Sequence, residues 1–198
     1  HISCDILSIQ LAYQYLSEIY AGRDPEIPAF LDHVARINQR TANPKAAEFW
    51  STKLANQPEP TDFYGRTTAA ATPQTERIPV PLGSERSSRL HELAQADGIR
   101  ALTPQLSLMN IFTAALATTL HRIGGQDTVS IGSPFHNRPT PLAKQTLGLY
   151  IQLYPIFVGF KTDETLRTLI PRIQRESLSN RRYAPNIDQK IDEAAAFD

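Results

Sequence analysis

Two residue types able to do acid–base chemistry stand at the start of the sequence. His1 and Asp5 lie four positions apart, directly before a run of apolar residues at helical spacing. A neutral imidazole, with a pKa of about 6.5, can accept a proton or hold a nucleophile by a hydrogen bond. A carboxylate one helical turn away can accept from that ring or anchor the turn to a cation. The same residues are also typical of a tag remnant followed by a capping aspartate, or of a copper site if the N-terminus were secreted and a second histidine suitable.

Two downstream segments carry polar residues where strands and loops are expected to meet. Residues 132–138, Gly-Ser-Pro-Phe-His-Asn-Arg, are typical of a stiff loop at a strand end, where Arg138 could form a bidentate pair with a carboxylate. In residues 147–152, Gly148 predicts a bulge or a close backbone approach, and Gln152 needs a hydrogen-bond partner if it is buried. A surface turn and an ordinary core strand are the plainer interpretations of these two segments.

Other kinds of chemistry find no support in the sequence. There is no phosphate-binding loop, dinucleotide fingerprint, nucleophile elbow or Cys/His cluster at zinc spacing, so we expect no metal and no directly bound cofactor. The net charge is zero, which disfavours nucleic acid and anionic lipid as partners, and no apolar run is long enough to span a membrane. Cys4 is the only cysteine, and the sequence shows no secretory signal; we expect a cytoplasmic protein.

Helices and strands interleave along the chain, which predicts an α/β or α+β fold. Helical spacing predicts helices over 6–20, 29–40, 45–56, 85–97, 104–123 and 163–180. Strands are expected over 128–132 and 150–160, with 77–82 an edge strand at most because it holds two prolines. Residues 57–77, rich in Pro, Thr, Ala and Gln, are the best linker candidate.

Local signals predict where these helices begin and end. Ser84 should cap the helix over 85–97, Thr103-Pro104 should begin the long helix, and Gly124-Gly125 should end it. Pro171 is expected to kink or split the last helix. The expected apolar face of the first helix comprises Ile9, Ala12, Tyr13, Leu16 and Tyr20. That of the long helix comprises Leu108, Ile111, Phe112, Ala115, Leu116, Thr119 and Leu120.

Taken in order, these segments resemble the condensation domains of nonribosomal peptide synthetases. The family signature is His-His-x-x-x-Asp-Gly, and residues 1–5 look like its second His through its Asp, with Ile6 in place of the Gly. Residues 147–153 resemble the motif Ile-Gly-x-Phe-Val-Asn-Thr, with Gln152 in place of the Asn and Leu153 in place of the Thr.

Two further segments extend the resemblance over nearly the whole chain. Residues 48–54, with Phe49 and Trp50, are similar to the aromatic helix that precedes the crossover between the lobes. Residues 121–134 are similar to the helix-to-strand segment of the second lobe.

The resemblance implies a chloramphenicol-acetyltransferase-like fold. In that fold two lobes, each a two-layer sandwich of a sheet and helices, enclose a tunnel. Residues 1–66 would be the remainder of the N-terminal lobe and the crossover, and residues 67–198 a partial C-terminal lobe. We expect the chain to be the central part of a longer domain, and we expect poor activity or none if the 198 residues are the whole molecule.

The implied reaction is acyl transfer from a carrier-protein-bound donor thioester to an acceptor amine. By resemblance His1 is the catalytic imidazole, and Asp5 pairs with Arg138 to bind the motif loop to the second lobe. Ile6, Asn137, Tyr150 and Gln152 are the candidates for lining the tunnel or contacting substrate. The implied partners are donor and acceptor carrier proteins, which bring the substrates on phosphopantetheine, and neighbouring synthetase domains.

Other functions on the same fold stay open. An ester-forming or coenzyme A-dependent acyltransferase is one alternative, and a non-catalytic module that docks carrier proteins is another. Ile6 and the His136-Asn137 pair depart from the small residues common in the family. We expect a working but atypical member.

Overall fold

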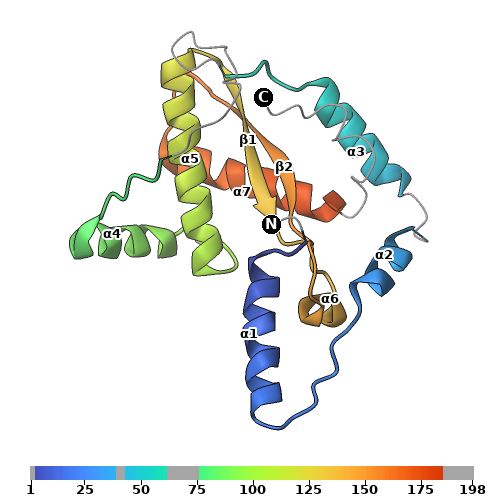
Figure 1. Cartoon of the computed structure of the whole chain (residues 1–198). Coiled ribbons are helices and arrows are strands. Elements are labelled where there is room, and N and C mark those ends of the chain that lie inside the picture. The colour runs from blue at the N-terminus through green and yellow to red at the C-terminus, as the bar shows by residue number, and fades with distance from the viewer. Residues whose placement is uncertain (1–2, 39–42, 62–75, 185–198) are drawn as a thin grey trace.

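The computed structural model describes residues 3–38, 43–61 and 76–184 of the 198-residue chain. Within these ranges the fold is a mixture of helices and a two-stranded sheet (Figure 1). The elements in chain order are α1 (Ile6–Tyr20), α2 (Phe30–Asn38), α3 (Pro44–Ala55), α4 (Gly83–Gln95), α5 (Pro104–Gly124), β1 (Thr128–Phe135), α6 (Pro141–Gln145), β2 (Gln152–Gly159) and α7 (Leu166–Tyr183).

The centre of the structure is the antiparallel pair of strands β1 and β2. Thr128 pairs with Gly159 at one end of the ladder and Phe135 with Gln152 at the other. Helices α5 and α7 pack on these strands and on each other, and α4 packs on α5 (Figure 1). Burial of their apolar side chains supplies the main core. That core contains Ala94, Ile99, Ile111, Ala114, Ala117, Leu120, Val129, Ile156, Val158, Leu169, Ile170 and Ile173.

A second cluster, made of aromatic side chains, joins α3 to the end of the sheet where Phe135 pairs with Gln152. The Trp50 ring stacks on Tyr154 with centroids 5.7 Å apart, and its Nε1–H donates to the carbonyl oxygen of Tyr183 at 3.1 Å. Phe49 stacks on the Tyr183 ring at 4.5 Å. These contacts hold α3 against the last turn of α7.

Helix boundaries follow local chemistry closely. Asp5 and Thr103 cap α1 and α5 through their side chains, and Gly125, with φ of 68°, ends α5 in the left-handed conformation that glycine adopts without strain. Ser84 is not a cap: α4 begins at Gly83, two residues before the predicted start at residue 85, and Leu82 holds the cap position. Helix α7 runs through Pro171 without splitting, because the packed apolar residues on both sides of the proline hold the helix together.

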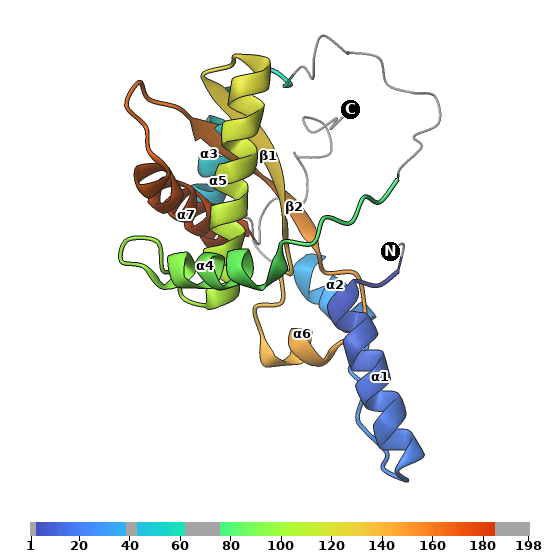
Figure 2. The ribbon, with the colours of Figure 1, turned by 90° about the vertical axis from the view of Figure 1, so that its left-hand side faces the viewer.

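The face predicted to be buried is wrong for α1 and partly right for α5, where Ile111 and Leu120 are buried as expected. Tyr13 is 70% exposed and Tyr20 90%, and Figures 1 and 2 show α1 projecting away from the sheet. What packs on α1 in the described structure is the segment from α6 to β2, and it meets the side that carries Ser8 and Tyr15. On α5, Phe112 is 52% exposed, whereas the buried positions include small residues such as Ala114 and Ala117, which allow close approach to the sheet.

The strands also differ from their predicted extents. β1 continues to Phe135 instead of ending at Gly132, and β2 begins at Gln152, so Gly148 and Tyr150 precede it. Residues 77–82 form no strand. Part of the predicted linker, residues 62–75, lies outside the described residues. No helix in the described ranges is both long and apolar enough to cross a membrane.

Candidate functional site

Asp5 connects the start of α1 to the loop before β2. Its carboxylate accepts from the backbone N–H of Ser8 at 2.9 Å, which caps the helix, and from the backbone N–H of Tyr150 at 3.1 Å. The side chain is 1% exposed. A carboxylate with so little access to water is stable only when its oxygens are fully hydrogen-bonded, and these two N–H groups provide part of that requirement.

Arg138 supplies the opposite charge. Its Nη2 lies 2.9 Å from Oδ1 of Asp5, and its own side chain is 3% exposed. Its Nη1 donates to the carbonyl oxygens of Ala143 at 2.5 Å and Thr146 at 2.6 Å. The ion pair uses one nitrogen rather than the bidentate geometry expected from the sequence, because Nη1 donates to the two carbonyl oxygens instead of to Asp5.

Ser8 completes this buried network, and sequence reasoning missed it. Its Oγ accepts from Arg138 Nη2 at 2.7 Å and from the Gly148 N–H at 3.0 Å. The hydroxyl proton can go to Oδ1 of Asp5, 2.9 Å away, or to the Gly148 carbonyl oxygen, 2.6 Å away. The available signal was a serine three positions after a capping aspartate, which places its side chain beside the cap.

The network decides the charge state of Asp5. Burial alone raises the pKa of this carboxyl, but hydrogen bonds from Ser8, Arg138 and Tyr150 together outweigh it, and the net pKa lies below the ordinary value of 3.8. The group is therefore an anion at neutral pH. It holds the guanidinium in place and is poorly suited to act as a proton donor.

Gly148 and Tyr150 bring α2 into the same region. A Cβ at Gly148 would overlap the Phe30 ring, which is the close approach that the sequence predicted. The Tyr150 ring meets Phe30 edge-on at 5.3 Å and lies 4.2 Å from the His33 ring. The Arg138 guanidinium lies 4.0 Å from the centroid of the Tyr150 ring, a cation–π distance.

The remaining predicted site residues lie at different places. His1 lies outside the described residues. Ile6, on the first turn of α1, is 51% exposed. Asn137 adopts φ of 44°, and its Nδ2 donates to Oε1 of Gln152 at 3.0 Å, which ties the end of β1 to the start of β2.

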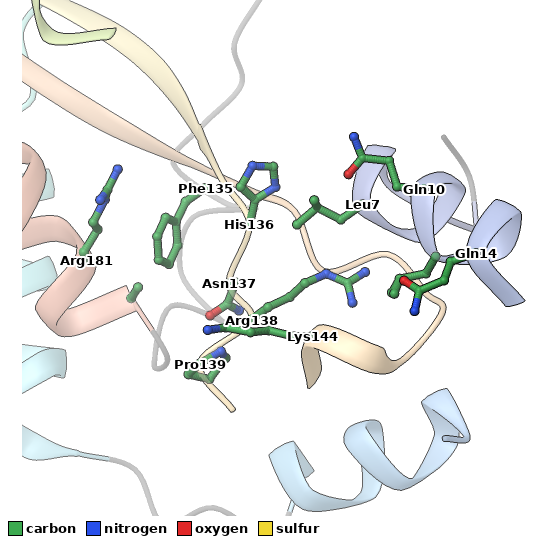
Figure 3. Close-up of a pocket in the computed structure, with 12 residues that line it drawn as sticks. Leu7, Gln10, Gln14, Phe135, His136, Asn137, Arg138, Pro139, Lys144 and Arg181 are labelled. Carbon is green, nitrogen blue, oxygen red and sulfur yellow. The ribbon is translucent and has the colours of Figure 1, made fainter. Parts of the chain in front are cut away.

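A cavity of about 540 Å³ lies beside the network. Leu7, Gln10 and Gln14 of α1 line one side, the segment from Phe135 to Pro139 lines another, and Arg181 of α7 lies across from α1 (Figure 3). Of the four residues predicted to contact substrate, Asn137 lines this cavity, whereas Ile6, Tyr150 and Gln152 do not. Among the described residues, no group of three or more His, Cys, Asp or Glu side chains is arranged to hold a metal ion.

Comparison of the chain with known proteins identifies one family. A family model described as "Condensation domain" matches residues 1–185. The chain is 29% identical over 167 residues to the nonribosomal peptide synthetase gliP of Aspergillus fumigatus, covering 82% of this chain and 7% of that protein. It is 31% identical over 157 residues to a linear gramicidin synthase of Brevibacillus parabrevis, covering 76% of this chain and 2% of that protein.

Solved structures show the same fold. The first condensation domain of the calcium-dependent antibiotic synthetase, in complex with a substrate analogue, superposes with a TM-score of 0.76 at 20% identity and covers 93% of this chain. The chain spans 42% of the length of that structure. The condensation domain of the monacolin K polyketide synthase gives a TM-score of 0.66 at 20% identity, with 92% of this chain and 44% of that chain covered. The fold expected from the resemblance, chloramphenicol-acetyltransferase-like, is confirmed, and the chain belongs to the condensation domain family.

Proposed function

We propose that this chain forms the central part of a condensation domain that transfers an acyl group from a carrier-bound thioester to an amine. Residues 1–66 then complete an N-terminal lobe and the crossover, and residues 67–198 form part of a C-terminal lobe. The family match over residues 1–185, which includes the His1 to Asp5 motif, supports this proposal.

The observation that carries the proposal is the buried contact between Asp5 and Arg138. The two residues are 133 positions apart, yet their side chains meet at 2.9 Å with almost no exposure to water. Asp5 is four residues from His1 in the sequence, and the contact holds the start of α1, which follows the proposed catalytic imidazole along the chain. Catalysis by a positioned group requires this kind of support, because small displacements from reactive geometry are costly.

In the proposed reaction the acceptor amine attacks the carbonyl carbon of the donor thioester. A C–N bond forms, the C–S bond breaks, and the proton lost by the amine ends on the departing thiol. The imidazole of His1 would hold the amine or relay this proton. Asp5 and Arg138 would support the fold around it and would take no part in proton transfer.

The partners in this proposal are two carrier proteins, each presenting its substrate on phosphopantetheine, and the neighbouring domains of a synthetase. Two relatives carry the name nonribosomal peptide synthetase, gliP of Aspergillus fumigatus and the probable synthetase CymA of Salinispora arenicola, which supports this assignment. The single cysteine, Cys4, is compatible with the cytoplasmic location that we propose.

The test is single-turnover acyl transfer by the complete condensation domain that contains this chain. It uses one carrier loaded with a donor thioester and one with an acceptor amine. We expect His1→Ala to reduce turnover by roughly a hundredfold or more while leaving the melting temperature unchanged. Asp5→Ala and Arg138→Ala should instead lower the melting temperature, because they remove a buried ion pair. Carrier binding without turnover by the unsubstituted domain would refute the proposal and support a docking module.

A further inference from the structure

The cavity beside the Asp5–Arg138 network carries an uncompensated positive charge. Arg138, Lys144 and Arg181 contribute to its wall, and no acidic residue does among the described residues. Asp5, which does not line the cavity, compensates the charge of Arg138. Within the described ranges, neither Lys144 nor Arg181 forms an ion pair.

Two of these cations are partly removed from water. Arg138 is 7% exposed, and its Nε–H is buried with no hydrogen-bond partner in the described structure. The Arg181 guanidinium lies over the Phe135 ring at 5.3 Å, and burial lowers the pKa of this arginine, although an arginine stays protonated at neutral pH. Arg138 has Asp5 as its counter-ion, whereas Arg181 has lost hydration without gaining one in the described ranges, and such a cation favours an anion nearby.

The rest of the wall combines four polar side chains, Gln10, Gln14, His136 and Asn137, with a larger apolar part. Leu7 and Leu11 from α1 face Phe135, Pro139 and Ala184 across the cavity. A volume of about 540 Å³ is in the range of sites for small organic ligands. A bare inorganic anion would leave this apolar surface unused, whereas an acyl chain or ring would cover it.

We propose that this cavity binds a small organic acid: an acyl group or ring in the apolar part, with a carboxylate held between Lys144 and Arg181. This inference rests on the proposed function for its biological meaning, since it assigns a carboxylate-bearing substrate to the condensation reaction. A phosphate, such as that of a carrier tether, is an anion of related chemistry, and the experiment separates the two sources.

The test is calorimetric titration of the complete condensation domain that contains this chain with octanoate, with octanamide as a neutral probe of the same length, and with inorganic phosphate. We expect octanoate to bind about tenfold more tightly than octanamide, because the two cations contribute only to the charged ligand. Equal affinity for octanoate and octanamide would overturn the proposal. Displacement of octanoate by inorganic phosphate of similar affinity would also overturn the organic-acid assignment and favour a phosphate site.

Substitutions locate the site. Arg181→Gln and Lys144→Gln should each reduce the preference for octanoate by roughly threefold to fivefold, whereas Arg100→Gln, at an exposed arginine outside the cavity, should not. Leu11→Trp should weaken both eight-carbon probes, whereas Leu16→Trp, at a half-exposed position of α1 outside the cavity wall, should leave them unchanged. Equal effects within either matched pair would refute this location.

The binding experiment is independent of the proposed reaction, because free acids need neither a carrier protein nor the His1 imidazole. Selective octanoate binding in a domain without acyl transfer would keep the site and refute the proposed function. Acyl transfer without selective octanoate binding would refute the site alone.

Discussion

Alanine in place of Asp5 leaves the Arg138 guanidinium buried without a counter-charge. The substitution also removes the acceptors for the N–H groups of Ser8 and Tyr150. Breaking a buried ion pair from one side costs about 3–5 kcal/mol of unfolding free energy, because the remaining charge is left uncompensated. A domain is stabilised by only about 5–15 kcal/mol in total, so we expect Asp5→Ala to place the chain near the limit of folding.

The chain provides a matched control of the same chemistry at the surface. Glu85 and Arg89 on α4 also form a carboxylate–guanidinium pair, at 2.7 Å, but their side chains are 78% and 74% exposed. Water and salt screen such a pair, so Glu85→Ala should cost less than about 1 kcal/mol. The contrast between the aspartate and glutamate substitutions compares a buried pair that also accepts hydrogen bonds from Ser8 and Tyr150 with an exposed pair of the same charges.

The assay is equilibrium urea unfolding of the unsubstituted chain, Asp5→Ala, Arg138→Ala and the double variant. Removing both partners leaves no buried charge, so we expect the double variant to lose about 1–3 kcal/mol less than the sum of the single losses. Asp5→Asn, which keeps an oxygen acceptor for Ser8, provides a milder variant if the alanine does not fold. Additive losses, or a loss for Asp5→Ala no larger than that for Glu85→Ala, would refute the structural role assigned to this pair.

Individual contacts lead to three further predictions. The pKa of Asp5 is lowered in the folded chain, so its contribution to stability is complete above the ordinary value of 3.8 and is lost as the pH falls through the lower folded value. The unsubstituted chain should therefore lose its stability advantage over Asp5→Asn below about pH 4, which acid unfolding titrations of the two would measure. Gly148→Ala should lower the unfolding free energy by about 1–3 kcal/mol because the new methyl group overlaps the Phe30 ring, and combination with Phe30→Ala should cost less than the sum of the two changes; additivity in calorimetry would contradict this. Trp50→Phe should cost about 1–3 kcal/mol, since it leaves the Tyr183 carbonyl without its donor, and an unchanged melting temperature would argue against that hydrogen bond.

The ends of several helices could be predicted from the sequence alone. α1 spans Ile6–Tyr20 as expected, and α5 begins after Thr103 and ends before Gly125. These boundaries depend on groups within three or four residues of one another: a capping side chain, a proline in the first turn, a glycine at the last. Where a local rule misplaced an end, as at Ser84, the observed start of the helix lies only two residues from the predicted one.

The pairing of Asp5 with Arg138 came from family resemblance, since spacing within the sequence could not indicate a partner 133 positions away. Ser8 had no such resemblance to identify it. Its role arises only where α1 meets Gly148 and Arg138, two groups that the chain brings to it from different segments.

The sequence by itself determined where the longer helices lie, which side chains could carry charge or accept a proton, and which family the motifs match, but it did not indicate the short helix α6. The tertiary structure alone decided which face of α1 is buried, that Ser8 joins the ion pair, and that Lys144 and Arg181 share a cavity with apolar residues from α1. The physical reason is the separation along the chain of the groups that interact. Helix caps and turns are settled by hydrogen bonds between near neighbours in the chain, whereas burial and charge pairing depend on which distant segments the fold brings together.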